Sequence, residues 1–261
     1  MAMQHFLLAV LMFFFGAALA SFFDVLTDPN RLRKRRSYCP HCRETLRWYE
    51  MIPLLSYLRQ AGKCRSCGKK IAFQHFFGEF MGGLIFLSVF LTVFLGLGFG
   101  GRRMDPWNMS ALVYSSLVFG YFALFLLISF ADTKTFLVSL SWLLGLNALA
   151  LLLLFFPQHP SSAFVSLAAG MAAGGLLSLV SFFHGWKKLG EADIFIVVSM
   201  GFVLGFAGVA AGLISASVSG IIICFARKWG GSVTDIYRMK LPFAPLLLLG
   251  TIFGLFFTRF F

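Results

Sequence analysis

Charged side chains are scarce in this chain of 261 residues: they make up 12% of the sequence, and only ten residues are aspartate or glutamate. Hydrophobic residues make up 59%, and several apolar stretches are long enough to cross a hydrocarbon core of about 30 Å. This composition is that of a polytopic helical membrane protein. A β-barrel is excluded because it needs short segments of alternating polarity, whereas residues 144–156 are apolar throughout except for Asn147.

Eight apolar segments are expected to span the membrane as helices. The sixth and seventh contain Gly201, Gly205, Gly208 and Gly212, so we expect them to be short, kinked or packed tightly against neighbours. Between helix packing and a gating hinge, the pattern of small residues favours packing. The expected spans are residues 5–27, 77–99, 109–131, 137–156, 162–183, 193–208, 210–226 and 242–258.

Positive charges are distributed unevenly and predict the orientation of the chain. Of its 22 Lys and Arg, twelve lie between Arg31 and Lys70, while Arg102, Arg103 and Arg259 fall on the opposite side. This bias predicts a membrane protein with its N-terminus outside and the basic loop in the cytoplasm. The net charge of +12 therefore reflects topology and contact with lipids, and not binding to nucleic acid.

The first apolar segment contains a sequence similar to a signal-peptidase site, Ala18-Leu19-Ala20 before Ser21. No Lys or Arg precedes the apolar stretch, and strong positive charge follows it. The sequence therefore favours an uncleaved first helix.

Cysteine is also rare, with five residues, but four of them form two pairs of equal spacing, Cys39-Pro-His-Cys42 and Cys64-Arg-Ser-Cys67. Two CxxC knuckles are typical of a tetrahedral structural zinc site, because each pair turns two thiolates towards one ion. Four neighbouring thiols can instead form disulfides, which require an oxidising compartment. Since a loop rich in Lys and Arg is expected in the cytoplasm, the sequence favours zinc. Cys224 is interpreted as a small buried side chain.

Two of the acidic residues lie at the ends of spans, where charge beside a bilayer is costly and commonly functional. Asp132 follows the third span and Asp193 opens the sixth, and the predicted topology places both at one membrane face. Two such carboxyls could divide the work of peptide hydrolysis, the ionised one taking a proton from water and the protonated one donating to the scissile carbonyl. Taken singly, each is better interpreted as a helix cap, and the sequence alone does not show that they meet.

In order along the chain, these features resemble the bacterial type IV prepilin leader peptidases, which also N-methylate their products. The resemblance is strongest between the two knuckles, over residues 46–58, and it extends across nearly the whole chain. Its further segments are Gly16 to Phe23, Ser37 to Gly68, Asp132, Gly190 to Asp193, and Leu241 to Leu246.

The resemblance implies an intramembrane aspartic protease with Asp132 and Asp193 as its catalytic pair. Its substrates would be prepilins or pseudopilins, cut at the cytoplasmic face just before their apolar helix. The new N-terminal amine would then be methylated from S-adenosylmethionine. By the same resemblance, residues 1–27 are the first transmembrane helix, residues 28–76 the cytoplasmic zinc loop, and residues 77–261 the protease core.

The position of a cofactor is not marked by any Gly-rich nucleotide motif. Glu79 matches a glutamate that relatives carry at the start of the second span, which makes it a candidate to contact the amine being methylated. Capping of that helix is the equal alternative. The sequence leaves open the oligomeric state and which pilus, secretion or competence system supplies the substrate.

Several positions depart from the family pattern and indicate a divergent member. Ala192 replaces the second glycine of the usual GxGD motif, and residues 136–140 replace the Leu-Pro-Asp that commonly follows Asp132. Asp24 stands where relatives often carry asparagine, and we expect it to form an ion pair with a basic residue of the loop.

Two alternative functions remain at this point. One is a zinc-stabilised transporter or scaffold in which the aspartates carry protons or ions, although they lie at a boundary and no inverted repeat is visible. The other is a peptidase without methyltransferase activity.

Overall fold

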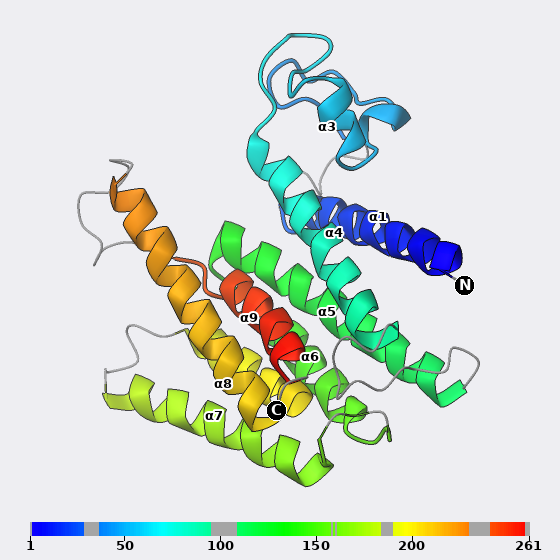
Figure 1. The fold of residues 1–261 in the computed structure, drawn as a ribbon. Coiled ribbons are helices and arrows are strands. Elements are labelled where there is room, and N and C mark those ends of the chain that lie inside the picture. The colour runs from blue at the N-terminus through cyan, green and yellow to red at the C-terminus, as the bar shows by residue number, and fades with distance from the viewer. Residues whose placement is uncertain are drawn as a thin grey trace. The chain divides into compact units, whose positions relative to one another are not determined.

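The computed structural model describes residues 2–28, 37–94, 109–157, 159, 161–183, 190–229 and 241–258. These residues form a helical protein, as predicted, in which α1, α4, α5, α7 and α8 are long and apolar enough to cross a membrane (Figure 1). Shorter apolar helices, α6 and α9, accompany them. The elements are α1 (Ala2–Leu26), η1 (Trp48–Glu50), α3 (Leu55–Arg59), α4 (Phe73–Phe94), α5 (Met109–Thr135), α6 (Leu140–Leu153), α7 (Ala163–Phe183), α8 (Glu191–Trp229) and α9 (Ala244–Phe257).

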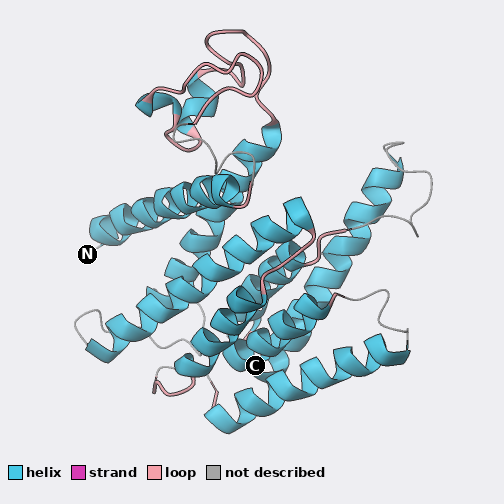
Figure 2. Ribbon diagram, turned by 180° about the vertical axis from the view of Figure 1, so that it is seen from behind, coloured by secondary structure: helices cyan, strands magenta, loops and turns pink. Residues whose placement is uncertain are grey.

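The chain divides into two compact units, Met1–Phe90 and Leu91–Phe261. In the first unit, Gly16 of α1 and Gly82 of α4 approach so closely that a Cβ atom on either would clash with the carbonyl oxygen of the other. Close contact through small residues is a common way for membrane helices to pack, because lipid gives no hydrophobic drive to associate. The segment between α1 and α4 carries η1, α3 and loops that connect them (Figure 2).

In the second unit, α8 is broken at Gly205, whose φ of 67° and ψ of −173° are not helical. A Cβ atom on Gly212 would lie 3.0 Å from the terminal methyl carbon of Met200, although a continuous helix separates residues 12 apart by about 18 Å. The chain therefore folds back at Gly205. A positive φ of this kind is rarely open to a residue with a side chain, so glycine is required there.

Helix packing explains the other glycines of α8. Gly201 meets Gly170 of α7, and beyond the break Gly212 meets Gly250 of α9 without room for a Cβ atom at either contact. The predicted packing role is confirmed, and Gly205 adds the sharp bend. The sixth and seventh predicted spans are thus the two halves of α8, which separate at residue 205 and not at 209.

The interior of the second unit is built largely on α5, whose aromatic residues Tyr121, Phe122 and Phe125 are fully buried. The Tyr121 hydroxyl lies 3.1 Å from the hydroxyl of Ser199 in α8, so these two buried hydroxyl groups are hydrogen-bonded to each other. This contact fixes α5 against the first half of α8. Because the two helices carry Asp132 and Asp193 near their ends, it also helps to position those ends.

Most predicted spans agree with the helices to within a few residues. The third is longer than expected, since α5 continues to Thr135 and carries Asp132 in its last turn, not after its end. Residues 95–99 of the second predicted span lie outside the described residues, as do Arg102, Arg103 and Arg259 on the predicted outer side.

Candidate functional site

Asp132 is held by the start of a helix distant in sequence. Its Oδ2 atom accepts a hydrogen bond from the backbone N–H of Ala244 at 3.1 Å, and the N–H of Phe243 also donates to the carboxylate. Phe243 and Ala244 are the N-cap and the first residue of α9, where amides have no partner inside the helix. Asp132 therefore does cap a helix, as expected. The helix that it caps is α9, and not one to which Asp132 itself belongs.

Asp193 lies in the first turn of α8. The backbone N–H of Gly190 donates to its carboxylate, which is how a residue at this position commonly satisfies the amide just before a helix. A Cβ atom on Gly190 would lie only 3.3 Å from Oδ2 of Asp193. Glycine at position 190 therefore leaves the room that this carboxylate occupies.

The carboxyl groups of Asp132 and Asp193 interact electrostatically. Their carboxyl groups are close enough for the charge of Asp132 to act directly on Asp193. The sequence could not show this interaction, nor the hydrogen bond that joins Asp132 near the end of α5 to the start of α9. Both helix starts direct the positive ends of their dipoles towards the carboxylates. A pair of carboxyls in such a place can hold a single proton between them.

Ala192 does not need the conformational freedom of glycine here. It lies within α8 and is absent from the positive-φ residues of the described chain. The change from the family's usual glycine therefore leaves the backbone at Asp193 regular. Alanine is in fact the better helix former at this position.

The two cysteine knuckles have the same backbone design. In the first, Cys39 N–H donates to Glu44 O at 2.9 Å and Arg43 N–H to Cys39 O at 2.9 Å. The second repeats these bonds from Cys64 to Lys69 O, and from Gly68 to Cys64 O, at 2.8 and 2.9 Å. Each turn ends in a residue with positive φ, Arg43 at 59° and Gly68 at 68°. Such paired turns orient the sulfur atoms of each CxxC towards one point.

All four Sγ atoms of Cys39, Cys42, Cys64 and Cys67 lie within 4.8 Å of one another. Cys39 and Cys67 are 3.9 Å apart, and Cys42 and Cys64 are 4.0 Å apart. Tetrahedral ligands at a Zn–S distance of about 2.3 Å would be roughly 3.8 Å apart. The donor set and its dimensions therefore fit one structural zinc ion, and the four cysteines are not paired as disulfides.

The sulfur atoms also influence one another electrostatically. Burial acts to raise the pKa of the Cys39 thiol, but backbone hydrogen bonds from Cys42 and His41 outweigh it, and the pKa falls to about 7. The backbone amide of Glu44 acts to lower the pKa of Cys42, yet burial and the neighbouring thiols raise it to about 11. Without a cation, the Cys39 thiol thus loses its proton more readily than the Cys42 thiol. A bound metal would favour the deprotonated form of both.

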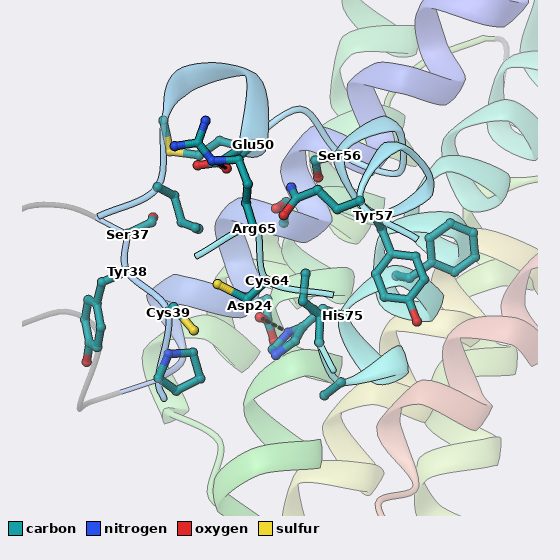
Figure 3. Close-up of a pocket in the computed structure, with 18 of the residues that line it drawn as sticks. Asp24, Ser37, Tyr38, Cys39, Glu50, Ser56, Tyr57, Cys64, Arg65 and His75 are labelled. Carbon is teal, nitrogen blue, oxygen red and sulfur yellow. Dashed lines mark hydrogen bonds and ion pairs between the residues drawn. The ribbon is translucent and has the colours of Figure 1, made fainter. Parts of the chain in front are cut away.

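A cavity of about 760 Å³ lies in the first unit, between the knuckles and the facing ends of α1 and α4 (Figure 3). Asp24, the expected ion-pair residue, lies in its wall, and its Oδ2 atom is 2.8 Å from Nδ1 of His75. The predicted pairing is confirmed, although its partner is a histidine of α4 and not a basic residue of the loop. Figure 3 shows the two side chains meeting within the cavity.

Glu79 also lines this cavity. Its Oε2 atom accepts a hydrogen bond of 2.7 Å from the N–H of Leu54, which directly precedes α3 and has a φ of 61°. Glu79 therefore ties the zinc loop to α4 by supporting the start of α3. The expectation that it caps its own helix is replaced by this longer-range contact.

The segment between the knuckles is fastened to the second knuckle. Glu50, whose side chain is only 5% exposed, pairs with Arg65 at 3.5 Å and accepts a hydrogen bond of 2.8 Å from the N–H of Arg47. Arg65 also donates to the hydroxyl of Tyr49 at 2.7 Å. The family resemblance is strongest over residues 46–58. These contacts offer a reason, since the segment contributes residues to the wall of the cavity and the contacts fix it beside the knuckles.

Some groups of the aspartate site cannot be recognised from sequence. The amides of Phe243 and Ala244 carry no side-chain signal, although the segment from Leu241 to Leu246 is part of the family resemblance. Its two prolines offer the available clue. Pro245 lies in the first turn of α9, where proline is well tolerated because its missing N–H would have no helical partner.

Comparison with known proteins adds an independent finding. Residues 14–93 match the family model described as the bacterial peptidase A24 N-terminal domain. A Bacillus subtilis (strain 168) protein named prepilin leader peptidase/N-methyltransferase is 30% identical over 251 residues, which are 93% of this chain and 91% of the relative. Proteins of the same name from Myxococcus xanthus (strain DK1622) and Vibrio cholerae (El Tor Inaba N16961) are 30% and 29% identical. These cover 83% and 91% of this chain, and 62% and 85% of the relatives. No solved structure matches.

Proposed function

Because the chain belongs to the prepilin leader peptidase/N-methyltransferase family, we propose that it cleaves the leader peptides of prepilins or pseudopilins with Asp132 and Asp193 as catalytic residues. The observation that supports this assignment is that the charge of Asp132 acts on Asp193, while the first amide of α9 holds Asp132 in place. A transporter role gains no comparable support. In a transporter, acidic residues that carry ions are expected near the middle of a span. Asp132 and Asp193 lie instead in the last turn of α5 and the first turn of α8.

The hydrogen bonds divide the two roles. Asp132 accepts a hydrogen bond from the N–H of Ala244 at the positive end of α9, and this donor favours its ionised form. In the resting pair, Asp132 is the carboxylate and Asp193 holds the shared proton. Asp132 takes a proton from water as the water oxygen attacks the scissile carbonyl carbon, and Asp193 gives its proton to the carbonyl oxygen.

Breakdown of the resulting tetrahedral diol reverses both transfers. Asp132 gives its proton to the leaving nitrogen as the C–N bond breaks, and Asp193 recovers a proton from a diol hydroxyl. The free amine, the carboxyl product and the original pair are then restored. Asp132 and Asp193 lie near helix ends, so a substrate whose helix remains in lipid could extend its scissile bond to water at the membrane boundary. In the orientation predicted by the positive charges, this is the cytoplasmic face of the inner membrane.

Methylation of the new N-terminus from S-adenosylmethionine belongs to the same proposal, and the first unit offers the place for it. The cavity beside the knuckles falls in the volume range of small-molecule sites, which is about 300–1,000 Å³. Its wall carries carboxylates, among them Asp24 and Glu79, and also the basic residues Arg65, Lys69 and Lys70, which suits a ligand with both positive and negative groups such as S-adenosylmethionine. When bound there, the cofactor would supply an electrophilic methyl group, while Glu79 keeps the start of α3 in the wall.

Zinc in this proposal is structural. Four thiolates complete a tetrahedral shell and leave no position for a reacting water. Cys39 and Cys64 line the cavity, so an ion held by the knuckles would fix the cavity wall. Loss of the ion should therefore weaken the binding of any ligand in the cavity more than it slows peptide hydrolysis at the aspartates of the second unit.

The proposal is tested with the purified full chain, a prepilin that carries its leader, and S-adenosylmethionine. We expect the leader to be removed at a single bond and the mature N-terminus to gain the mass of one methyl group, both measured by mass spectrometry. An intact prepilin after incubation with folded, zinc-containing protein would contradict the peptidase assignment. Cleavage without the added methyl group would leave a peptidase alone.

A further inference from the structure

Five large apolar side chains are exposed in the segment between the knuckles. Trp48 is 74% exposed and Leu58 is 63% exposed, and Met51, Ile52 and Leu55 are exposed between them. Trp48 lies in η1, and Leu55 and Leu58 lie in α3. Glu50 and Leu54, which lie between them in the sequence, instead contact Arg65 and Glu79. We call these five exposed residues the Trp48 face.

The Trp48 face adjoins a membrane-spanning helix. In α3, Tyr57 packs its ring 4.9 Å from that of Phe76 and 6.4 Å from that of Phe73, both in the first turn of α4. Phe73 in turn contacts Phe77, and both rings are exposed. An aromatic cluster thus joins α3 to the beginning of a span, so α3 lies at the depth where α4 enters the bilayer.

Positive charge borders the same face. Arg47 directly precedes Trp48, Arg59 directly follows Leu58, and both are exposed. The guanidinium of Arg59 lies 5.0 Å from the ring centre of Tyr49, which orients it beside the segment. Tryptophan, leucine and arginine in such an arrangement are typical of segments that lie in the interface of an anionic bilayer.

We propose that the Trp48 face inserts into the interface of an anionic phospholipid bilayer, with Arg47 and Arg59 at the lipid phosphates. The zinc loop is then a surface-bound element and not a domain free in solution. Its cavity, one wall of which is formed by the same segment, is held at the membrane boundary. The inference concerns lipid contact alone and does not depend on the enzymatic activity.

The test uses the full chain in nanodiscs of phosphatidylcholine and phosphatidylglycerol whose acyl chains carry bromine either near the headgroup or near the bilayer centre. Subtracting the fluorescence of Trp48→Phe from that of the unaltered chain isolates the emission of Trp48. Shallow bromines should quench this emission about twofold or more, and deep bromines should quench it less. Zinc content shows that both proteins are folded.

A matched pair of variants sharpens the result. Leu58→Glu places one negative charge on the Trp48 face and should restore most of the Trp48 emission, whereas Gln74→Glu places one on an exposed polar position of α4 and should not. Two outcomes overturn the proposal. Unquenched emission at long wavelength would mean that Trp48 is in water. Unquenched emission at short wavelength would mean that protein, either the second unit or a second copy of the chain, covers the face.

Discussion

In the zinc loop, all four sulfur ligands come from one short stretch between Cys39 and Cys67, and each pair is shaped by its own turn. At the aspartate site, the carboxylate of Asp132 depends on an amide 112 positions away, at Ala244. The loop is thus a local structure that one ion can hold together. The aspartate site depends on the packing of a helical bundle, so damage to one region should leave much of the other intact.

The largest expected effect is at the aspartates themselves. Asp132→Asn and Asp193→Asn should each lower leader cleavage by about 10³-fold or more, because the base and acid act as one unit. For the same reason, the double variant should lose little more than either single one. The rate of cleavage of a purified prepilin measures this. Substantial residual cleavage by a folded single variant, free of the parent enzyme, would remove that residue from the pair.

The zinc loop should respond differently. The purified chain should contain about one zinc per molecule, and Cys42→Ser should lose most of it, because three thiolates hold the ion less well than four. Methylation should fall at least about tenfold, while cleavage should change much less. Metal analysis and mass spectrometry of the product give both values. An equal loss of the two activities in protein that is still inserted would show that the loop also supports the aspartate site.

A smaller effect is expected from Gly190→Ala. The added Cβ atom would lie 3.3 Å from Oδ2 of Asp193 and should displace the carboxylate by a few tenths of an ångström. Cleavage should fall about tenfold, since catalysis is sensitive to small errors of position. Gly175→Ala is the control, because a Cβ atom there meets nothing within 4 Å. If both variants cleave equally well, the space at Gly190 is not what positions Asp193.

Ala192→Gly, which restores the family's usual residue, should have the smallest effect. Ala192 is helical, so glycine should cost less than about 1 kcal/mol of stability and gain no special backbone conformation. Cleavage should stay within about twofold of the parent. A large gain in cleavage would indicate that this position needs a conformation other than the helical one.

The sequence predicted the cluster of four cysteines well because spacing alone brings the two thiols of a CxxC pair together. It also predicted the spans, since apolar length is visible directly. It could not predict that α8 folds back at Gly205 and not four residues later, because several glycines there were equivalent as a pattern. Nor could it show that the amides of Phe243 and Ala244 bind Asp132, since backbone groups have no signature of their own.

The contrast between a local cysteine loop and an aspartate site built from segments far apart in the sequence has one direct test. A pilin whose leader has already been removed is incubated, together with S-adenosylmethionine, with the Asp193→Asn variant and with the unaltered enzyme, and methylation of its N-terminus is measured. If the two regions act separately, both proteins should methylate the pilin at the same rate. If only the unaltered enzyme does so, although the variant is folded and holds zinc, the two activities share one site and the separation of the two regions is disproved.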